Sequence, residues 1–134
     1  MTEFKSTHLI EVRFRDIDAM GHVNNAVYFS YFEQARMKFF AETIGKWEWD
    51  KHGVLLAHNE IDYHAPVLLN DLVEVETFCL NMGKKSLNFG YDVFVTRDHM
   101  RFKAASGSSV LVCFDYVEQK TIAIPNQWRE ALGV

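Results

Sequence analysis

The feature that most constrains the fold is one long aromatic helix pattern between Ala26 and Ile44. Large or small apolar side chains recur there at spacings of three and four: Tyr28, Tyr31, Phe32, Ala35, Phe39 and Phe40. Charged residues fall between them, so the spacing predicts an amphipathic helix over 26–44 that ends at Gly45. The apolar stripe is wide, which indicates that other elements wrap around this helix.

Strand patterns lie on both sides of this helix. Before it, residues 8–15 alternate well enough for one strand. After Gly53 the chain predicts four long strands. Residues expected to share a face within a strand are Val73, Val75, Thr77 and Cys79, then Leu87, Phe89, Tyr91, Val93 and Val95, then Val110, Val112, Phe114 and Tyr116. A short helix over about 126–132 follows Pro125.

Short turn-forming segments, at 69–71, 81–83 and 97–99, separate the predicted strands. These connections are too short for crossover helices, so neighbouring strands are expected to be antiparallel. The fold class is therefore α+β: a curved antiparallel sheet of about five strands wrapped around one long central helix. Such a sheet has an exposed edge, which favours pairing with a second copy of the chain.

Length and composition favour a single domain spanning residues 1–134. The chain is 49% hydrophobic, which excludes intrinsic disorder, and its two cysteines, Cys79 and Cys113, are expected to be buried free thiols. With 14 basic and 18 acidic side chains the net charge is -4, so a whole-molecule basic surface for nucleic acid is absent. No signal peptide or membrane span is predicted. We expect a soluble, cytoplasmic protein with no nucleic-acid or membrane partner.

The segment that could carry chemistry lies just before the long helix, between Arg15 and Asn25. A helix N-terminus exposes backbone N–H donors that can polarise a carbonyl, and a nearby carboxylate can act as a nucleophile or general base. Asp16 and Asp18 are the candidate carboxylates. Helix capping alone would also select Asp, Asn and Gly here, so this alternative stays open. A metal site with His22 matches no ligand spacing that we can justify, and no metal is expected.

The rest of the chain offers few other sites. The remaining histidines are scattered, and no Gly-x-Ser-x-Gly elbow accompanies Ser106, Ser108 and Ser109. The turn at Gly83 carries Lys84 and Lys85, a candidate anion contact, although two lysines at a turn are usually just solvated.

The segment Asp16-Ile17-Asp18-Ala19-Met20-Gly21-His22-Val23-Asn24-Asn25, with Tyr28 and the aromatic helix, resembles the signature of a known family. This is the 4-hydroxybenzoyl-CoA thioesterase-like family of acyl-CoA thioesterases, which have the hotdog fold. The resemblance continues through Ile61-Asp62-Tyr63, Pro66, Asp71, Gly83-Lys84-Lys85-Ser86 and Ile124-Pro125, and so covers about residues 8–132.

The resemblance implies specific roles for residues of this chain. Asp18 would be the catalytic carboxylate, as nucleophile or as general base for water, and the backbone N–H of Asn25 would polarise the thioester carbonyl. Gly21, His22 and Asn24 would lie against the substrate. The nucleotide and phosphates of coenzyme A would contact Lys84, Lys85 and Ser86.

The same resemblance implies an enzyme that hydrolyses acyl-CoA to free acid and coenzyme A, with no cofactor beyond the substrate's own coenzyme A. The Gly21–Asn25 form is more similar to members acting on fatty acyl-CoA than to the aryl-specific archetype. Family members assemble as homodimers, often paired into homotetramers, with active sites at the dimer interface. Two alternatives remain: a thioesterase acting on acyl-carrier protein, and a non-catalytic module that binds acyl-CoA.

Overall fold

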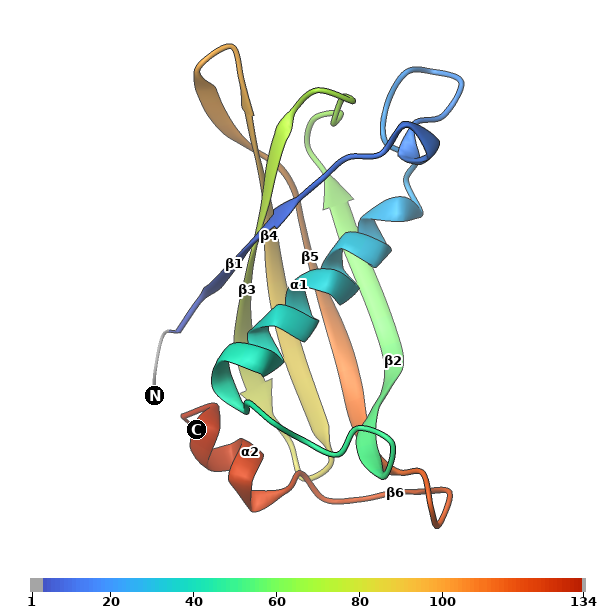
Figure 1. Ribbon diagram of the computed structural model, residues 1–134, viewed down its shortest axis with the longest axis vertical. Helices are drawn as coiled ribbons and strands as arrows, with labels where there is room; N and C mark the ends of the chain where they lie inside the picture. Colours follow the sequence, from blue (N-terminus) through green and yellow to red (C-terminus); the bar gives the residue numbers. More distant parts are fainter. Residues whose placement is uncertain (1–3, 134) are drawn as a thin grey trace.

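A six-stranded antiparallel sheet curves around one long helix in the computed structural model, which describes residues 4–133 (Figure 1). The strand order is β1-β3-β4-β5-β2, with the short β6 pairing with the end of β5. The single-domain prediction for 1–134 includes residues 1–3 and 134, which lie outside the described residues. The elements are β1 (Ser6–Ile10), α1 (Val27–Thr43), β2 (His52–Tyr63), β3 (Leu72–Met82), β4 (Ser86–Arg97), β5 (Met100–Asp115), β6 (Lys120–Thr121) and α2 (Asn126–Ala131).

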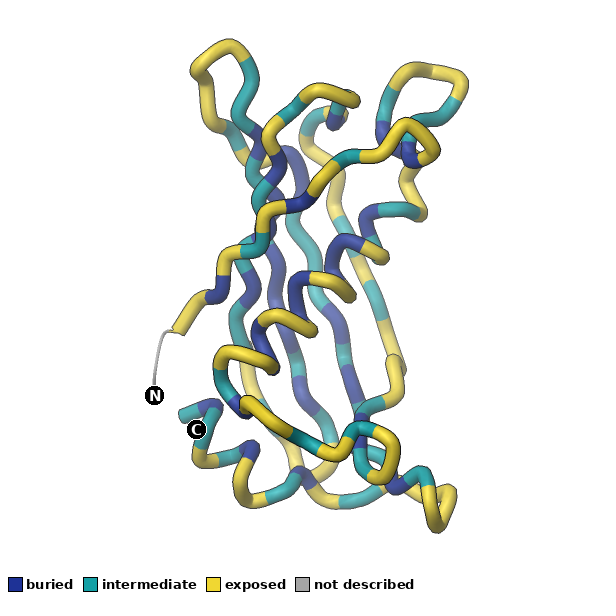
Figure 2. The backbone as a smooth tube through the Cα atoms, in the orientation of Figure 1, coloured by how far each residue is buried: buried dark blue, intermediate teal, exposed yellow. Residues whose placement is uncertain are grey.

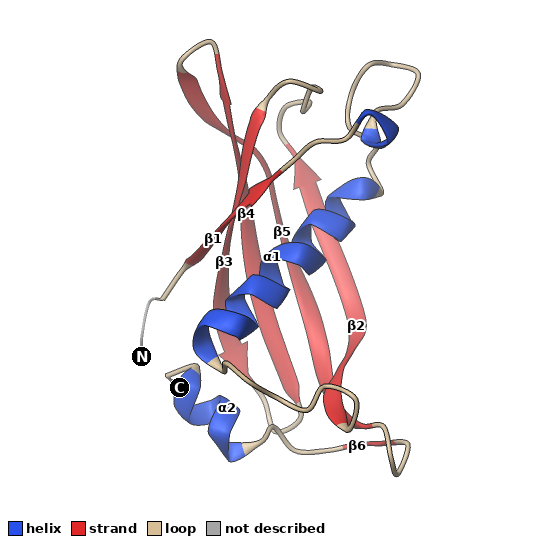
Figure 3. Cartoon of the chain, in the orientation of Figure 1, coloured by secondary structure: helices blue, strands red, loops and turns tan. Residues whose placement is uncertain are grey.

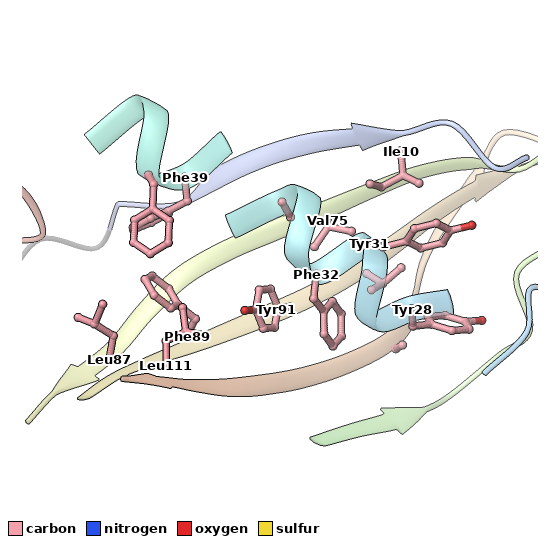
Figure 4. Packing of buried hydrophobic residues seen from close by; sticks show 14 of the residues in the cluster. Ile10, Tyr28, Tyr31, Phe32, Phe39, Val75, Leu87, Phe89, Tyr91 and Leu111 are labelled. Atoms are coloured by element: carbon pink, nitrogen blue, oxygen red, sulfur yellow. The ribbon is translucent and has the colours of Figure 1, made fainter. Parts of the chain in front are cut away.

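Helix α1 lies across the sheet (Figure 3). Its aromatic stripe is buried, as the three- and four-residue spacing predicts. Its 17 residues make it about 26 Å long. The Phe32 ring stacks on Tyr91 of β4 with ring centroids 4.2 Å apart, and further along the helix Phe39 contacts Phe89 edge-on (Figure 4). Phe40 also contacts Phe89 edge-on. These contacts fix the helix on the sheet.

The strand faces follow the alternation in the sequence. The five expected same-face residues of β4, from Leu87 to Val95, are all fully buried beneath α1. In β5 the expected set from Val110 to Phe114 is half-buried and lies on the face away from α1, and Tyr116, the last expected member, is a half-buried residue just after the strand. The alternate residues, Ser109, Leu111, Cys113 and Asp115, are the buried ones. The two cysteines are free, with Cys113 buried and Cys79 half-buried.

The first strand is shorter than the sequence predicts. It ends at Ile10 rather than at Arg15, and Phe14–Asp16 form one turn of 3-10 helix instead. The cause is local, since the carboxylate of Asp16 accepts a 2.9 Å hydrogen bond from the backbone N–H of Arg13. A side chain that bonds to the backbone a few residues away competes with strand pairing. The difference matters because this turn begins the loop that leads into α1.

Strand β2 forms one edge of the sheet, since it pairs with β5 and with no other strand among residues 4–133. Four consecutive residues near its middle are exposed: Leu55, Leu56, Ala57 and His58. Figure 2 shows most of this strand as exposed, in contrast to the buried central strands. Within the described chain, neither helix is long and apolar enough to cross a bilayer.

Candidate active site

The loop before α1 is anchored to the helix by Asp16. This side chain is only 1% exposed, and its carboxylate accepts hydrogen bonds from the Arg13 backbone N–H, the Arg13 guanidinium and the Tyr31 hydroxyl. Burial by itself would raise the pKa of Asp16, but the hydrogen bonds and charge of its partners outweigh burial and hold the pKa below its usual value. All of these partners are structural, so Asp16 holds the loop in place.

Asp18 occupies a tight turn two residues later. Its backbone N–H donates to the His22 carbonyl over 2.9 Å, and its Oδ1 accepts a 2.9 Å hydrogen bond from the Met20 N–H. Gly21 sits in this turn with φ +83°, a conformation that glycine adopts without steric cost. The second carboxylate oxygen, Oδ2, accepts no hydrogen bond from the described residues. The turn therefore fixes one oxygen of Asp18 and leaves the other available.

The start of α1 presents a backbone donor seven residues after Asp18. The Asn24 side chain accepts a hydrogen bond from the Ala26 N–H, and the Asn24 carbonyl accepts one from the Val27 N–H. Asn25 lies between them, and its own N–H donates to no acceptor in residues 4–133. On its other side, the Asn25 carbonyl accepts a 2.7 Å hydrogen bond from the hydroxyl of Tyr63, at the end of β2.

A pocket of about 250 Å³ opens next to Asn25. Its lining residues are His22, Val23, Asn25, Tyr28, Tyr63, His64, Ala65 and Pro66. The Tyr28 and Tyr63 rings meet edge-on, with centroids 5.0 Å apart. Burial raises the pKa of the Tyr28 phenol, and the nearby carboxylate of Asp18 adds to that rise. Asp18 therefore lies within electrostatic reach of the pocket, although it does not line it.

Tyr63 is the residue that sequence reasoning did not assign to the site. It belongs to a strand 38 positions after Asn25, and nothing in the local pattern of Ile61-Asp62-Tyr63 indicates that its hydroxyl meets the start of the helix. The separation in sequence is what hides the contact. Gly21 and Asn24, two of the predicted substrate contacts, are exposed beside the pocket, and His22 lines it.

The predicted coenzyme A contacts lie at the opposite end of the sheet. Ser86 pairs with Val112, which also pairs with Leu55, whereas Tyr63 at the other end of β2 pairs with Ala105. Leu55 and Tyr63 are eight residues apart in β2, or about 26 Å at the rise of a strand. One chain therefore does not bring the Lys84–Ser86 turn together with Asp18 and Asn25.

The turn itself is well defined. The Lys84 carbonyl accepts a hydrogen bond from the Ile124 N–H, and the Arg129 guanidinium donates to the Gly83 carbonyl over 2.6 Å. Both lysine side chains are exposed, and the Lys85 ammonium contacts the Thr121 hydroxyl. No group of three or more His, Cys, Asp or Glu side chains among residues 4–133 is placed to hold a metal ion.

Comparisons with known proteins give the family. The model of the thioesterase-like superfamily matches residues 12–132. The long-chain acyl-CoA thioesterase FadM of Escherichia coli is 28% identical over 131 residues, covering 92% of this chain and 93% of FadM. A Thermus thermophilus thioesterase, solved with coenzyme A and Zn, is 34% identical with a TM-score of 0.81, covering 95% of this chain and 90% of that one.

A second solved structure confirms the expected fold. It is a mutant 4-hydroxybenzoyl-CoA thioesterase in complex with 4-hydroxybenzoyl-CoA, which superposes with a TM-score of 0.88 at 16% identity and covers 96% of this chain and 99% of its own. At that identity the likeness shows the fold alone. Together with the family model, it confirms the curved antiparallel sheet around one helix and the predicted resemblance. The chain belongs to the thioesterase-like superfamily of hotdog-fold thioester hydrolases.

Proposed function

We propose that this protein hydrolyses fatty acyl-CoA to free acid and coenzyme A, using Asp18 and the backbone N–H of Asn25. The observation that carries the proposal is the pairing of a carboxylate oxygen without a partner in the described chain with an unpartnered helix-start donor, beside a pocket. The name of FadM, a long-chain acyl-CoA thioesterase that aligns over nearly the whole chain, supports the fatty acyl class.

Hydrolysis of a thioester needs few catalytic groups, since a thioester carbonyl is poorly stabilised by resonance and its thiolate leaves readily. The Asn25 N–H donates to the carbonyl oxygen as negative charge develops there. Oδ2 of Asp18 takes a proton from a water molecule, whose oxygen attacks the carbonyl carbon. The tetrahedral intermediate then collapses and the C–S bond breaks. The proton that Asp18 took from water passes to the thiolate of coenzyme A as it leaves, which restores the Asp18 carboxylate.

Direct attack by Asp18 is the alternative course. The carboxylate would displace the thiolate to give a mixed anhydride, which water would then hydrolyse. Hydrolysis in ¹⁸O-labelled water under single-turnover conditions tests for an anhydride that water opens at the aspartyl carbon. Label that enters Asp18 requires that anhydride and overturns water activation, the course that we favour. Label found only in the released fatty acid is the result expected for water activation, and it excludes opening of an anhydride at the aspartyl carbon.

A second copy of the chain would complete the site. Strand β2 is an unpaired edge, and antiparallel pairing with the partner's β2 reverses the direction of the second sheet. The Lys84–Ser86 turn of the partner subunit would then lie at the same end as Asp18 of this one. We therefore place the coenzyme A contacts of each site on the partner chain of a homodimer, which can pair further into a homotetramer.

The test is thiol release from a panel of acyl-CoA substrates of different chain length, compared for the wild type and Asp18→Asn. Loss of the carboxylate should lower kcat by at least about a hundredfold. Asp50→Asn, in an exposed turn between α1 and β2, is the matched control and should keep full activity. Full activity in Asp18→Asn overturns the role given to Asp18.

Two other results would assign a different function to the same site. Faster turnover of acyl-carrier protein than of acyl-CoA would indicate the carrier-bound substrate. Tight binding of acyl-CoA without any turnover would indicate a non-catalytic binding module.

A further inference from the structure

A second pocket, of about 330 Å³, lies where the chain passes from α1 to β2. Its lining residues are Lys46, Trp47, Glu48 and His52, and we call it the Trp47 pocket. None of these residues has a part in the proposed reaction. The volume is in the range of pockets that bind small molecules, and one wall is an aromatic ring. The Trp47 pocket is therefore a candidate binding site of its own.

The indole of Trp47 is held in place by its own chain. Its N–H donates a 2.7 Å hydrogen bond to the His52 carbonyl, and its ring meets the fully buried ring of Trp128 edge-on, with centroids 5.2 Å apart. Trp128 packs in turn against Phe40 of α1 and against Trp49. Trp47 itself is only half-buried. A fixed aromatic ring that borders a pocket can stack on a flat ligand ring, and little side-chain freedom is lost on binding.

The Trp47 pocket lies at the same end of the molecule as the Lys84–Ser86 turn. Helix α2 connects the two, because Trp128 contacts Trp47 and the next residue, Arg129, donates a 2.6 Å hydrogen bond to the Gly83 carbonyl. Figure 1 shows the connection from α1 to β2, the turn from β3 to β4 and helix α2 together at this end.

Strand register gives the separation between the turn and the start of β2. Cys113 of β5 lies between the two: its N–H donates to the Lys85 carbonyl on one side, and it pairs with Val54 of β2 on the other. Lys85 and Val54 are therefore two strand spacings apart, or about 10 Å. A nucleotide carries its base and its phosphates on opposite sides of a ribose, so one nucleotide can contact both places.

The lysines at this end are available to an anionic ligand. Lys46 and Lys84 are exposed and form no ion pair within residues 4–133, and Lys85 contacts the Thr121 hydroxyl. Glu48, the acidic residue of the pocket, is already paired with a lysine of its own turn over 3.5 Å. Lysines without a carboxylate partner beside an aromatic pocket favour a ligand that combines a flat ring with phosphate groups.

We propose that the Trp47 pocket binds the adenine base of coenzyme A by stacking on the indole. The inference rests on the proposed function, in which Lys84, Lys85 and Ser86 contact the nucleotide and its phosphates but no aromatic ring holds the base. The base and phosphate contacts then lie on one subunit, the same one that presents its lysine turn to the partner's catalytic site.

Calorimetric titration with adenosine 3′,5′-bisphosphate tests the subsite, since this compound carries the base and two of the phosphates of coenzyme A but no thioester. Trp47→Leu removes the aromatic face and should raise the Kd by about tenfold or more. Trp47→Phe keeps a flat ring and should stay within about threefold of the wild-type Kd. Phe14→Leu, which removes an exposed ring in the loop before α1, is the control and should leave the Kd unchanged.

Two results of the titration would overturn the subsite. One is a wild-type Kd in Trp47→Leu. The other is an equal loss of affinity in Trp47→Leu and Trp47→Phe, which would assign the effect to the lost hydrogen bond with His52 and not to the ring.

Tryptophan fluorescence provides a second measurement that does not need a folded leucine variant. The nucleotide should quench the emission of the wild type, and Trp47→Phe should lose most of that quenching. Quenching that persists in Trp47→Phe overturns the stacking contact. Neither measurement involves turnover, so failure of the subsite is distinct from failure of the proposed hydrolysis, which thiol release measures separately.

Discussion

The hydroxyl of Tyr31 donates a 2.8 Å hydrogen bond to Oδ2 of Asp16 in the interior of the protein. This bond joins the second turn of α1 to the loop that precedes it, fifteen residues earlier in the chain. The two aspartates therefore have different surroundings: Asp16 is enclosed by structural partners, whereas Oδ2 of Asp18 accepts no hydrogen bond from residues 4–133.

Removing the Tyr31 hydroxyl should destabilise the protein. Tyr31→Phe leaves a buried carboxylate with one partner fewer, and we expect the free energy of unfolding to fall by about 1.5–3 kcal/mol. Urea unfolding followed by circular dichroism measures the change. Tyr116→Phe removes a hydroxyl bonded to the neutral Val54 carbonyl and should cost less, about 0.5–1.5 kcal/mol. Equal losses of unfolding free energy in the two variants would show that the charge of Asp16 does not strengthen its hydrogen bond with Tyr31.

Stability should fall as the solution is acidified through the range in which Asp16 and Asp71 titrate. Both carboxylates have a folded-state pKa below the ordinary 3.8, Asp16 through Arg13 and Tyr31, and Asp71 through Arg97. The unfolded chain therefore binds protons first, so the stabilisation is present above pH 3.8 and is lost as pH falls through the folded-state values. Urea unfolding between pH 7 and pH 2.5 measures the slope. Asp71→Asn should flatten it, while Asp50→Asn should not.

The backbone N–H of Asn25 can be removed by substituting proline, which has no backbone donor. Asn25→Pro deletes the backbone donor, and we expect kcat to fall by about a hundredfold or more. Asn25→Ala keeps the N–H and should retain most of the activity. Circular dichroism confirms that both variants fold. Comparable kcat values in the two variants would assign the oxyanion contact to another group.

Tyr63 is expected to position the Asn25 backbone. Tyr63→Phe removes the 2.7 Å hydrogen bond to the Asn25 carbonyl and keeps the ring against Tyr28. Because the effect concerns the geometry of the transition state, we expect kcat to fall by about tenfold with little change in KM. Steady-state kinetics on one acyl-CoA separate the two constants. A rise in KM at constant kcat would instead make Tyr63 a simple substrate contact.

The Lys84 and Lys85 side chains should recognise only the nucleotide end of the substrate. Replacing both by glutamine should raise KM for acyl-CoA by about tenfold, and the wild-type KM should rise with salt. The same acyl group on N-acetylcysteamine, which lacks the nucleotide, should be hydrolysed equally well by both proteins. Lys120→Gln, on β6, serves as the control. A loss on both substrates would contradict the assignment.

Much of the architecture was predictable because its signals are local. The spacing of Tyr28, Phe32 and Phe39 predicts α1 to within one residue at each end, and alternation predicts the buried face of β4. The turns at 81–83 and 97–99 join the antiparallel pairs β3–β4 and β4–β5, as predicted, whereas the turn at 69–71 joins β2 to β3, which do not pair with each other. The end of β1 was predicted wrongly, because the side chain of Asp16 bonds to the backbone of Arg13 and stops the strand at Ile10.

By itself, the sequence determined the elements, their amphipathic faces and a candidate carboxylate just before the helix start, since periodicity and helix-start chemistry act over a few residues. The resemblance to the thioesterase family, and not a local pattern, singled out Asp18 and Asn25. Only the tertiary structure decided which aspartate is enclosed, that Tyr63 reaches Asn25, and that Lys84 lies at the far end of the sheet from both. Those facts depend on strand register and on the packing of α1. They are set by contacts between residues far apart in the chain, which no local pattern records.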